Sequence, residues 1–286
     1  MASLKEIKGR IASIRTTQKT TSAMRMVSSA KLHHVQGLTE AFLRYKENLE
    51  SIVDKLGGIS TQTSSDVATH SVLLVPISSN SGLCGAFNSN IAKSTLQRIK
   101  EWESQETKVS LLPIGKKIVN ALKKAGIDFN GDFVNLLEAI EKKGTFTAVS
   151  PLVAYAEKLR QSKEIDSVEF IYHHFKSRGT QTITTTPLLL DMPQIQTKED
   201  KEWLTEPSPE ELLSSLFPRL QNAQVYSIMI DSLTSEHAAR MLAMQTADDN
   251  ANDMLKELTL LYNKTRQQSI TNELIDMMGG KVGEHS

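Results

Sequence analysis

The stretch "RLQNAQVYSIMIDSLTSEHAARMLAMQTADDNANDMLKELTLLYNKTRQQSITNELIDMM", residues 219–278, contains neither proline nor glycine. A run of about sixty residues without a helix breaker predicts a single helix far longer than the usual one. At ~1.5 Å per residue it would be ~90 Å long. Ser208 and Pro209 predict its start, as N-cap and first-turn residue, and Gly279-Gly280 predicts its end. We therefore expect one helix over residues 208–280.

Two sets of residues in this segment recur every three or four positions, which is typical of a coiled-coil seam. They are Met254, Leu258, Leu261 and Thr265, followed by Ile270, Leu274 and Met277.

The N-terminal segment has the same character. Residues 3–56 contain no proline, and Gly57-Gly58 ends the pattern. Its seam is first apolar and then polar: Leu4, Ile7, Ile11, Ile14, then Gln18, Thr21, Arg25, Ser28. Two helices of matching pattern at the two ends of a chain predict an antiparallel coiled coil.

The middle of the chain alternates between strand-like and helix-like segments. The expected strands are 72–77, 109–114, 168–175 and 182–190, and the expected helices are 88–103, 116–124 and 146–160. Such alternation is typical of an α/β layer domain. The predicted fold class is therefore α/β: two long terminal helices (1–58 and 208–280) forming an antiparallel coiled coil, with an inserted α/β, Rossmann-like domain over 67–193. Polar segments at 59–70 and 194–207 are the expected linkers.

Composition narrows the functional class. The formal net charge is zero, which argues against a general nucleic-acid binder. Residues 1–46 nevertheless carry a net charge of +7 and residues 199–286 carry −8, so the two ends can attract each other or face different partners. The single cysteine, Cys84, excludes an internal disulfide and indicates a reducing compartment. The sequence contains no run of about 18 apolar residues, so it predicts no membrane-spanning helix.

Three stretches closely resemble the gamma subunits of F-type ATP synthases, in the same order and spacing. They are "KEIKGRIASIRTTQKTTSAMRMVSSAKL" (5–32), "VPISSNSGLCGAFNSN" (75–90) and "TSEHAARMLAMQTADDNANDMLKELTLLYNKTRQQSITNELIDMMGG" (234–280). The first and third are specific, because a shared heptad pattern does not reproduce those side chains in order.

The resemblance implies a central-stalk rotor that couples ion-driven rotation of the membrane c-ring to ATP synthesis on the beta subunits. It implies three alpha and three beta subunits around one gamma, with the epsilon subunit and the c-ring as further partners. It also implies a non-catalytic chain without cofactor or metal, peripheral on the membrane. With one cysteine there is no regulatory dithiol loop, which favours the cytoplasmic face of a bacterial inner membrane; a mature mitochondrial chain is the alternative.

By motif position, the resemblance assigns contacts with the alpha and beta ring, or coupling roles, to one set of residues: Met24, Arg25, Arg240, Arg266, Gln267, Thr271 and Glu273. Ser22 departs from the family pattern, in which many members have lysine, so one exposed positive charge is missing. The apolar seam from Ile270 to Met278 is expected to lie in the upper bearing of the ring.

Three further features of the sequence suggest other functions, namely a nucleotide site, a metal site and a scaffold. The turn "SGLCGAFN" lacks both GxxxxGK[ST] and GxGxxG, so it predicts a packed strand-to-helix turn rather than a nucleotide site. The pairs His33-His34 and His173-His174 have no accompanying metal-ligand cluster. The alternative function is a non-rotary coiled-coil scaffold with an inserted α/β domain. It predicts a persistent apolar seam, and the polar stretch from Thr16 to Ala30 argues against it.

Overall fold

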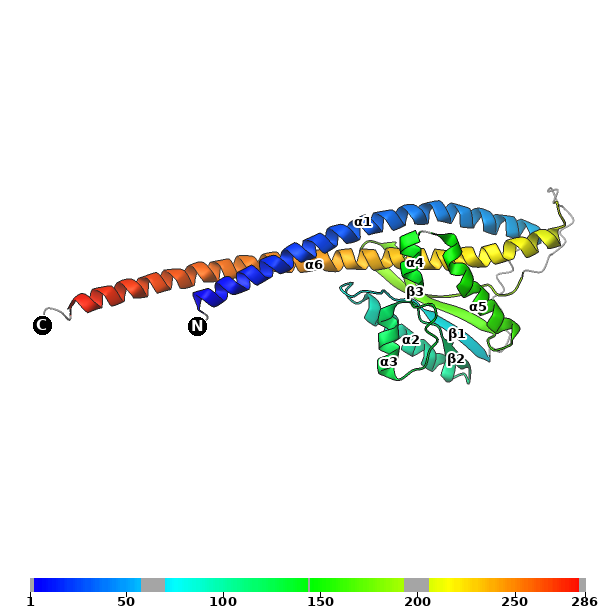
Figure 1. Ribbon diagram of the computed structural model, residues 1–286, viewed down its shortest axis with the longest axis horizontal. Coiled ribbons are helices and arrows are strands. Elements are labelled where there is room, and N and C mark those ends of the chain that lie inside the picture. Colours follow the sequence, from blue (N-terminus) through cyan, green and yellow to red (C-terminus); the bar gives the residue numbers. More distant parts are fainter. Residues whose placement is uncertain (1–2, 58–69, 144, 193–205, 283–286) are drawn as a thin grey trace. The chain divides into compact units, whose positions relative to one another are not determined.

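The computed structural model describes residues 3–57, 70–143, 145–192 and 206–282. The long terminal helices are α1, Leu4–Gly57, and α6, Pro209–Val282 (Figure 1). The chain divides into two compact units. The coiled-coil unit consists of Met1–Ser28 and Met241–Ser286, and the body unit consists of Ser29–Arg240.

A four-stranded mixed sheet forms the centre of the body unit. Its order is β2-β1-β3-β4, in which β1 pairs in parallel with β2 and β3, and β4 runs antiparallel to β3. The strands are β1 Ser71–Pro76, β2 Lys108–Leu111, β3 Ser167–Ser177 and β4 Thr180–Pro187. The continuous apolar run of β1 is buried along almost its whole length, as expected for a parallel strand covered on both faces.

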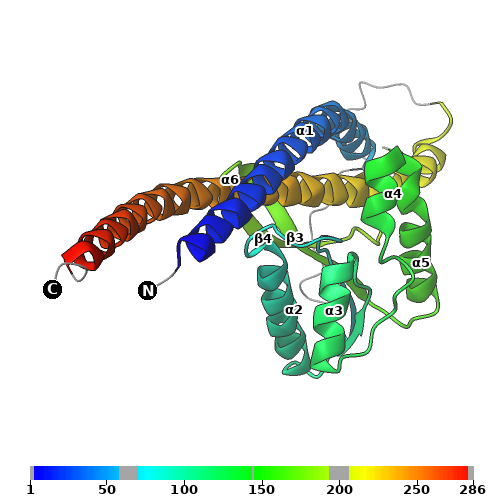
Figure 2. The same ribbon diagram turned by 60° about the vertical axis from the view of Figure 1, so that its left-hand side comes forward.

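Helices cover both faces of this sheet (Figures 1 and 2). On one face, α2 (Phe87–Glu103) and α3 (Lys116–Ala125) pack over Val72 and Leu74 of β1. On the other face, Leu73 and Val75 meet side chains of α4 (Leu136–Lys143), α5 (Ser150–Gln161) and α6. A short 3-10 helix, η1 (Phe146–Val149), precedes α5.

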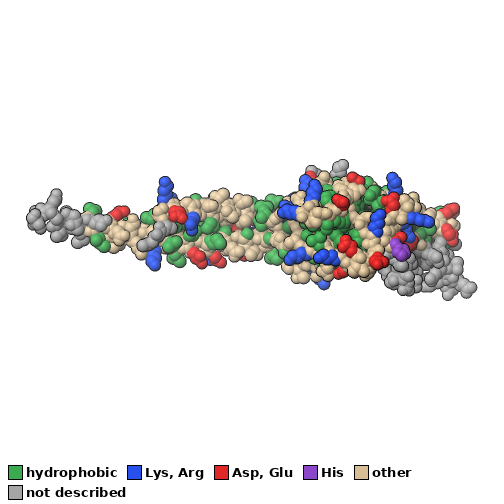
Figure 3. Space-filling model, turned by 90° about the horizontal axis from the view of Figure 1, so that it is seen from below, with side chains coloured by type: hydrophobic (Ala, Val, Ile, Leu, Met, Phe, Trp, Pro, Cys, Tyr) green, Lys and Arg blue, Asp and Glu red, His purple; other side chains and the backbone are tan. Residues whose placement is uncertain are grey.

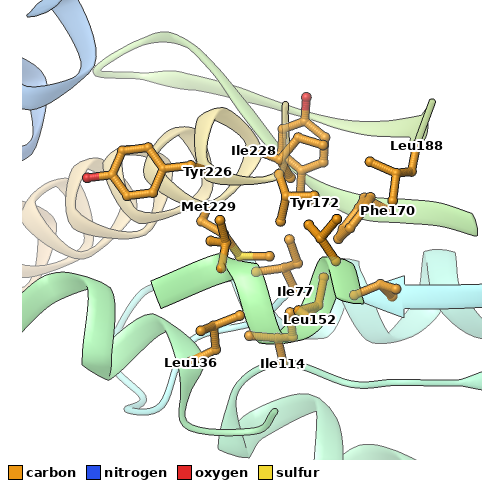
Figure 4. Close-up of a cluster of buried hydrophobic side chains, with 14 of the residues drawn as sticks. Ile77, Ile114, Leu136, Leu152, Phe170, Tyr172, Leu188, Tyr226, Ile228 and Met229 are labelled. Atoms are coloured by element: carbon orange, nitrogen blue, oxygen red, sulfur yellow. The ribbon is translucent and has the colours of Figure 1, made fainter. Parts of the chain in front are cut away.

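The core on the second face joins the sheet to the long helix α6. Figure 4 shows Ile77, Phe170 and Tyr172 of the strand region close to Ile228 and Met229 of α6, all of them buried. Burying a side chain of this size contributes about 1.5–3 kcal/mol. The middle of α6 is therefore an integral part of the α/β core.

Within the body unit, α1 also packs against α6. The rings of Phe42 and Tyr226 lie edge to face with centroids 4.6 Å apart. Further along, Leu49 and Val53 are buried in one cluster with Leu213 and Leu220.

In the coiled-coil unit the two helices run antiparallel. Gln18 bonds to Asn252, and Arg25, seven residues later on α1, bonds to Gln245, seven residues earlier on α6. Within the coiled-coil unit, the described residues of α6 that this register buries are Met244, Asp248 and Ala251.

The predicted elements are largely confirmed, with two differences. The N–H of Glu211 donates to the Ser208 hydroxyl at 3.3 Å, which confirms the predicted cap of α6. The helix expected over 146–160 is divided into η1 and α5, with a proline in the first turn of α5. The helix α4 was not expected, because its eight residues are too few to show a periodic pattern. Most of both expected linkers lies outside the described residues.

The predicted seam of α6 is partly wrong. Met254 and Leu261 are 54% and 46% exposed, whereas Leu255 and Tyr262 are half-buried. Two apolar stripes overlap at Leu258, and sequence spacing does not distinguish them. The register fixed by Gln18 and Asn252 turns the second stripe toward α1.

Gly115 occupies a position that no other residue fits. Its φ is +98°, and a Cβ atom there would lie 2.1 Å from the carbonyl oxygen of Ser78. The close approach joins the end of β1 to the start of α3.

We expect Gly115→Ala to lower the free energy of unfolding by about 2 kcal/mol or more, because both the φ and the contact oppose a side chain. Gly37→Ala is the matched control: it lies within helix α1 with nothing within 4 Å of its added methyl group. That substitution should stabilise the protein by about 0.5–1 kcal/mol. Urea unfolding of the full chain, followed by circular dichroism, measures both. Equal effects of the two substitutions would contradict the argument.

Candidate functional site

The coiled-coil unit has a polar seam over residues 18–28. The Gln18 amide Nε2 donates to Asn252 Oδ1 at 2.6 Å, and Arg25 Nη1 donates to Gln245 Oε1. Thr21 instead turns its hydroxyl to the backbone oxygen of Gln18 at 3.0 Å. Polar pairs at seam positions fix the register of a coiled coil but stabilise it less than apolar residues do. This part of the pair is therefore specified by hydrogen bonds.

Beyond the seam, the end of α6 has no α1 partner. The observed register places Leu4, the first residue of α1, beside about residue 266 of α6. The apolar residues further along are exposed: Ile270 48%, Leu274 56%, Ile275 60% and Met277 72%. Figure 3 shows hydrophobic side chains interspersed with charged ones on this unit, the left-hand part of the view. A row of exposed apolar residues on a helix marks a contact surface for another protein.

Four of the residues matched by the resemblance lie on this exposed part of α6. Arg266, Gln267, Thr271 and Glu273 are all exposed. The Thr271 hydroxyl donates to the backbone oxygen of Gln267 at 2.9 Å. Arg266 has no ion pair within the described residues, so its guanidinium is available to an acidic partner.

The other three matched residues lie elsewhere. Met24 and Arg25 are half-buried on α1 in the coiled-coil unit. Arg240 is only 8% exposed and lies in the body unit. The structure thus groups six of the seven in one unit and leaves Arg240 in the other.

Arg240 braces α6 against the turn that follows β1. Its Nη2 donates to the Ser81 hydroxyl at 2.8 Å and to Glu236 Oε1 at 2.7 Å, and its Nε donates to the Gly82 oxygen at 3.4 Å. A buried guanidinium with three acceptors is well satisfied, and removing one partner of such a pair is costly. The sequence pattern did not reveal the contacts with Ser81 and Gly82, because they join residues about 160 positions apart.

The same turn also occupies the N-terminus of α3. In α3, the first backbone N–H groups already have acceptors: Lys116 donates to Asn80 Oδ1 at 3.1 Å, Lys117 to the Ser79 oxygen at 3.2 Å, and Ile118 to Ser78 Oγ at 2.9 Å. Phosphate binding at a helix N-terminus requires free N–H groups. The turn after β1 is packed against neighbouring elements, as the sequence predicted.

Cys84 belongs to this turn and is buried. Asn88 Nδ2 approaches its sulfur at 3.1 Å. The interpretation of Cys84 as a small packed side chain agrees with this position.

A second polar cluster, which the sequence did not predict, joins three helices of the body unit. The Glu141 carboxylate of α4 lies 2.8 Å from Lys31 Nζ of α1 and 3.4 Å from His237 Nε2 of α6. The close approach of His237, opposed by burial and aided by Lys31, lowers the pKa of Glu141 to about 2. This carboxylate thus stabilises the arrangement of α1, α4 and α6.

The histidine pair His173-His174 is held by contacts within the body unit. His173 is buried, stacks on Phe87, and has a pKa lowered by that burial. His174 pairs with Asp231 at 2.6 Å. No group of three or more potential metal ligands occurs within the described residues. In that part of the chain no helix is long and apolar enough to cross a membrane.

Comparison with known proteins identifies the family. A family model described as ATP synthase matches residues 3–282. The ATP synthase gamma chain of Parabacteroides distasonis is 47% identical over 286 residues, covering 98% of each chain. The chain belongs to the ATP synthase gamma-chain family.

Other comparisons agree with this membership. The gamma chain of Bacteroides fragilis is 42% identical and aligns with 99% of this chain and all of its own length. A chain in the OSCP, F1 and c-ring assembly of Euglena gracilis mitochondrial ATP synthase shares the fold, with a TM-score of 0.67 at 20% identity over 99% of this chain and 94% of its own. A chain in the central stalk and c-ring of the Tetrahymena thermophila enzyme has a TM-score of 0.55 at 25% identity, over 80% and 99%.

The chain is the gamma subunit of an ATP synthase, the rotor of its central stalk, and is not itself catalytic.

We expect Glu141→Gln to lower the free energy of unfolding by about 2 kcal/mol at pH 7, after a discount for partial exposure. A carboxylate with a depressed pKa stabilises the fold above its unfolded value near 4.5 and loses this effect as the pH falls toward 2. The difference between the two proteins should therefore shrink between pH 5 and pH 3 in urea unfolding. Glu47→Gln, an exposed acid on α1, is the control. A difference that does not change with pH would show that only packing is involved.

Proposed function

We propose that this gamma subunit turns inside a ring of three alpha and three beta subunits, one copy per ring. Its further partners are the epsilon subunit and the c-ring, on the cytoplasmic face of a bacterial inner membrane. Residues 1–58 and 208–280 act as the shaft, and residues 67–193 form the domain at its base. The coupling is reciprocal: the angle of the shaft biases nucleotide affinity on the beta subunits, and nucleotide binding biases the angle.

One observation supports this proposal most directly. The end of α6 continues as a single helix past the first residue of α1 and exposes Ile270, Leu274 and Met277. An isolated apolar helix end requires a surrounding apolar surface. A collar of alpha and beta subunits provides such a surface as an upper bearing, without binding any one side of the helix.

The polar seam supports rotation over a fixed scaffold. Between Gln18 and Ser28 the seam is held by hydrogen bonds. The outward face of residues 16–20 carries Thr16, Thr17 and Thr20, whereas Met26 and Val27 further along are exposed apolar residues. The hydroxyls of these three threonines bond to their own helix backbone. Side chains satisfied within the shaft give little adhesion to a wall, which is what a turning shaft requires.

Met24, Arg25, Arg266, Gln267, Thr271 and Glu273 are the proposed contacts with the alpha and beta subunits. All lie in the coiled-coil unit, and four are exposed without an α1 partner. Arg240 contributes indirectly, by holding α6 to the turn after β1.

Co-expression of the matching alpha and beta subunits with and without this chain tests the proposal. We expect one copy to co-purify per three alpha–beta pairs and steady ATP turnover to rise. A chain ending at Thr271 should still assemble but deliver less torque in single-molecule rotation, whereas a chain ending at Val282 should behave as the full chain does. Failure to join the ring would favour the scaffold alternative. Loss of the ring on truncation at Thr271 would contradict the bearing.

A second test concerns the proposed contacts. Arg266→Ala should lower ATP-driven rotation rate several-fold, because an arginine paired with carboxylates across an interface contributes about 1–3 kcal/mol. Lys264→Ala removes another exposed cation, two residues away, that is not among the matched contacts. It should leave the rotation rate unchanged. Equal losses from the two variants would show that only net charge matters.

A further inference from the structure

The outer edge of strand β4 presents unpaired backbone groups among the described residues of the body unit. β4 forms one edge of the sheet, next to β3 (Figure 2). The opposite edge, β2, has only four residues, starts with a lysine, and is followed closely by Pro113. Short, charged, proline-flanked strands are protected against pairing. β4 is eight residues long, contains no charged residue, and has proline only at its last position.

The hydrogen bonds of β3 show which groups of β4 point outward. The Ile77 N–H donates to the Ile171 oxygen at 2.9 Å, so Ile171 directs its backbone toward β1. Ile171 faces Thr185 across the ladder, which makes this a non-hydrogen-bonded pair. Thr185, and by alternation Ile183 and Gln181, therefore direct their N–H and C=O groups away from the sheet.

Within the described residues, these outward groups have no backbone partner. The Pro187 carbonyl, next in the alternation, accepts a bond from Gln224 Nε2 at 2.7 Å. No backbone bond to Gln181, Ile183 or Thr185 on this side occurs within the described residues. Three donors and three acceptors thus lie in a row along an edge rich in β-branched residues, with Ile183 36% exposed.

Charges beside the edge restrict what can pair with it. Lys176 and Arg178, in the hairpin before β4, are exposed and have no ion pair in the part of the chain that the structure describes. At the other end, Asp191 is already paired with Arg160. If a second copy of this chain paired antiparallel with β4, its Lys176 and Arg178 would lie near Asp191, which is already paired with Arg160. If it paired in parallel, the cations of the two copies would lie side by side and repel each other.

We propose that the β4 edge binds a β-strand of another ATP synthase subunit, which extends the sheet by backbone pairing. The incoming strand is uncharged along Gln181–Thr185 and carries Asp or Glu beside Lys176 and Arg178. Backbone bonds provide affinity in such strand addition, and the terminal charges provide direction. The inference rests on the proposed place of the chain in the complex, but not on the shaft contacts.

Amide hydrogen exchange at single-residue resolution tests it, in the full chain alone and in the purified complex. In the free chain, Thr182, Thr184 and Thr186 should be protected by β3, while Gln181, Ile183 and Thr185 exchange rapidly. In the complex the second set should slow at least tenfold. If it exchanges equally fast in a complex that assembles and turns over ATP, this inference alone is overturned. Protection in the free chain that rises with concentration would identify a second copy and also overturn it. A chain that does not assemble overturns the proposed function and this inference with it.

Two variants sharpen the test. Thr185→Pro removes one outward donor and leaves the β3 ladder intact, so it should restore rapid exchange of Ile183 in the complex. Thr185→Val keeps the donor and should not. If Thr185→Pro does not fold, Lys176→Glu combined with Arg178→Glu replaces it. This double variant should abolish protection of the edge, and full protection in it would contradict the proposed acidic partner.

Discussion

The antiparallel packing of α1 against α6 is the contact on which the rest of the structure depends. A helix of 54 or 74 residues is not stable through local hydrogen bonds alone, and needs an apolar face buried along its length. In the body unit, aromatic and aliphatic residues supply that face: Phe42 against Tyr226, and Val53 beside Leu213. In the coiled-coil unit, the face becomes polar and hydrogen bonds take over. The pair is therefore held firmly where it joins the sheet and more weakly along the segment proposed to turn.

That difference has a physical use. If Gln18 and Asn252 were leucines, burial of each side chain would stabilise the helix pair by roughly 1–2 kcal/mol. This change would also permit other registers, because leucines pair with one another at any heptad step. An amide pair binds well in one register only. For a rotor subunit, fixed register along the shaft transmits angle from one end to the other, and this is a better reason for the polar seam than stability.

The sequence predicted elements well and contacts poorly. Long runs without proline or glycine determine a helix almost unaided, so α1 and α6 were predicted close to their observed bounds. The register of the coiled coil was not predicted. Met254 and Leu255 each begin an apolar stripe with heptad-like spacing, and only contact with the partner helix determines which stripe is buried. Glu141 was missed for a different reason: its helix is short, and its partners Lys31 and His237 come from opposite ends of the chain. The exposed residues Arg266 to Glu273 were found by resemblance alone, since nothing in their own pattern separates a contact surface from a solvated face.

The turn after β1 shows how an α/β domain can serve as a bracket. Parallel strands followed by helices bring free N–H groups to one edge of the sheet, where many relatives of this architecture bind nucleotides. Here Ser78, Ser79 and Asn80 occupy those groups from within the chain, and Gly115 permits the close approach. Arg240 of α6 then binds the far side of the same turn. The edge that elsewhere binds a ligand has thus become an attachment point for the long helix. A ligand bound at that edge would have to displace these contacts, so it would compete with the attachment of α6 itself.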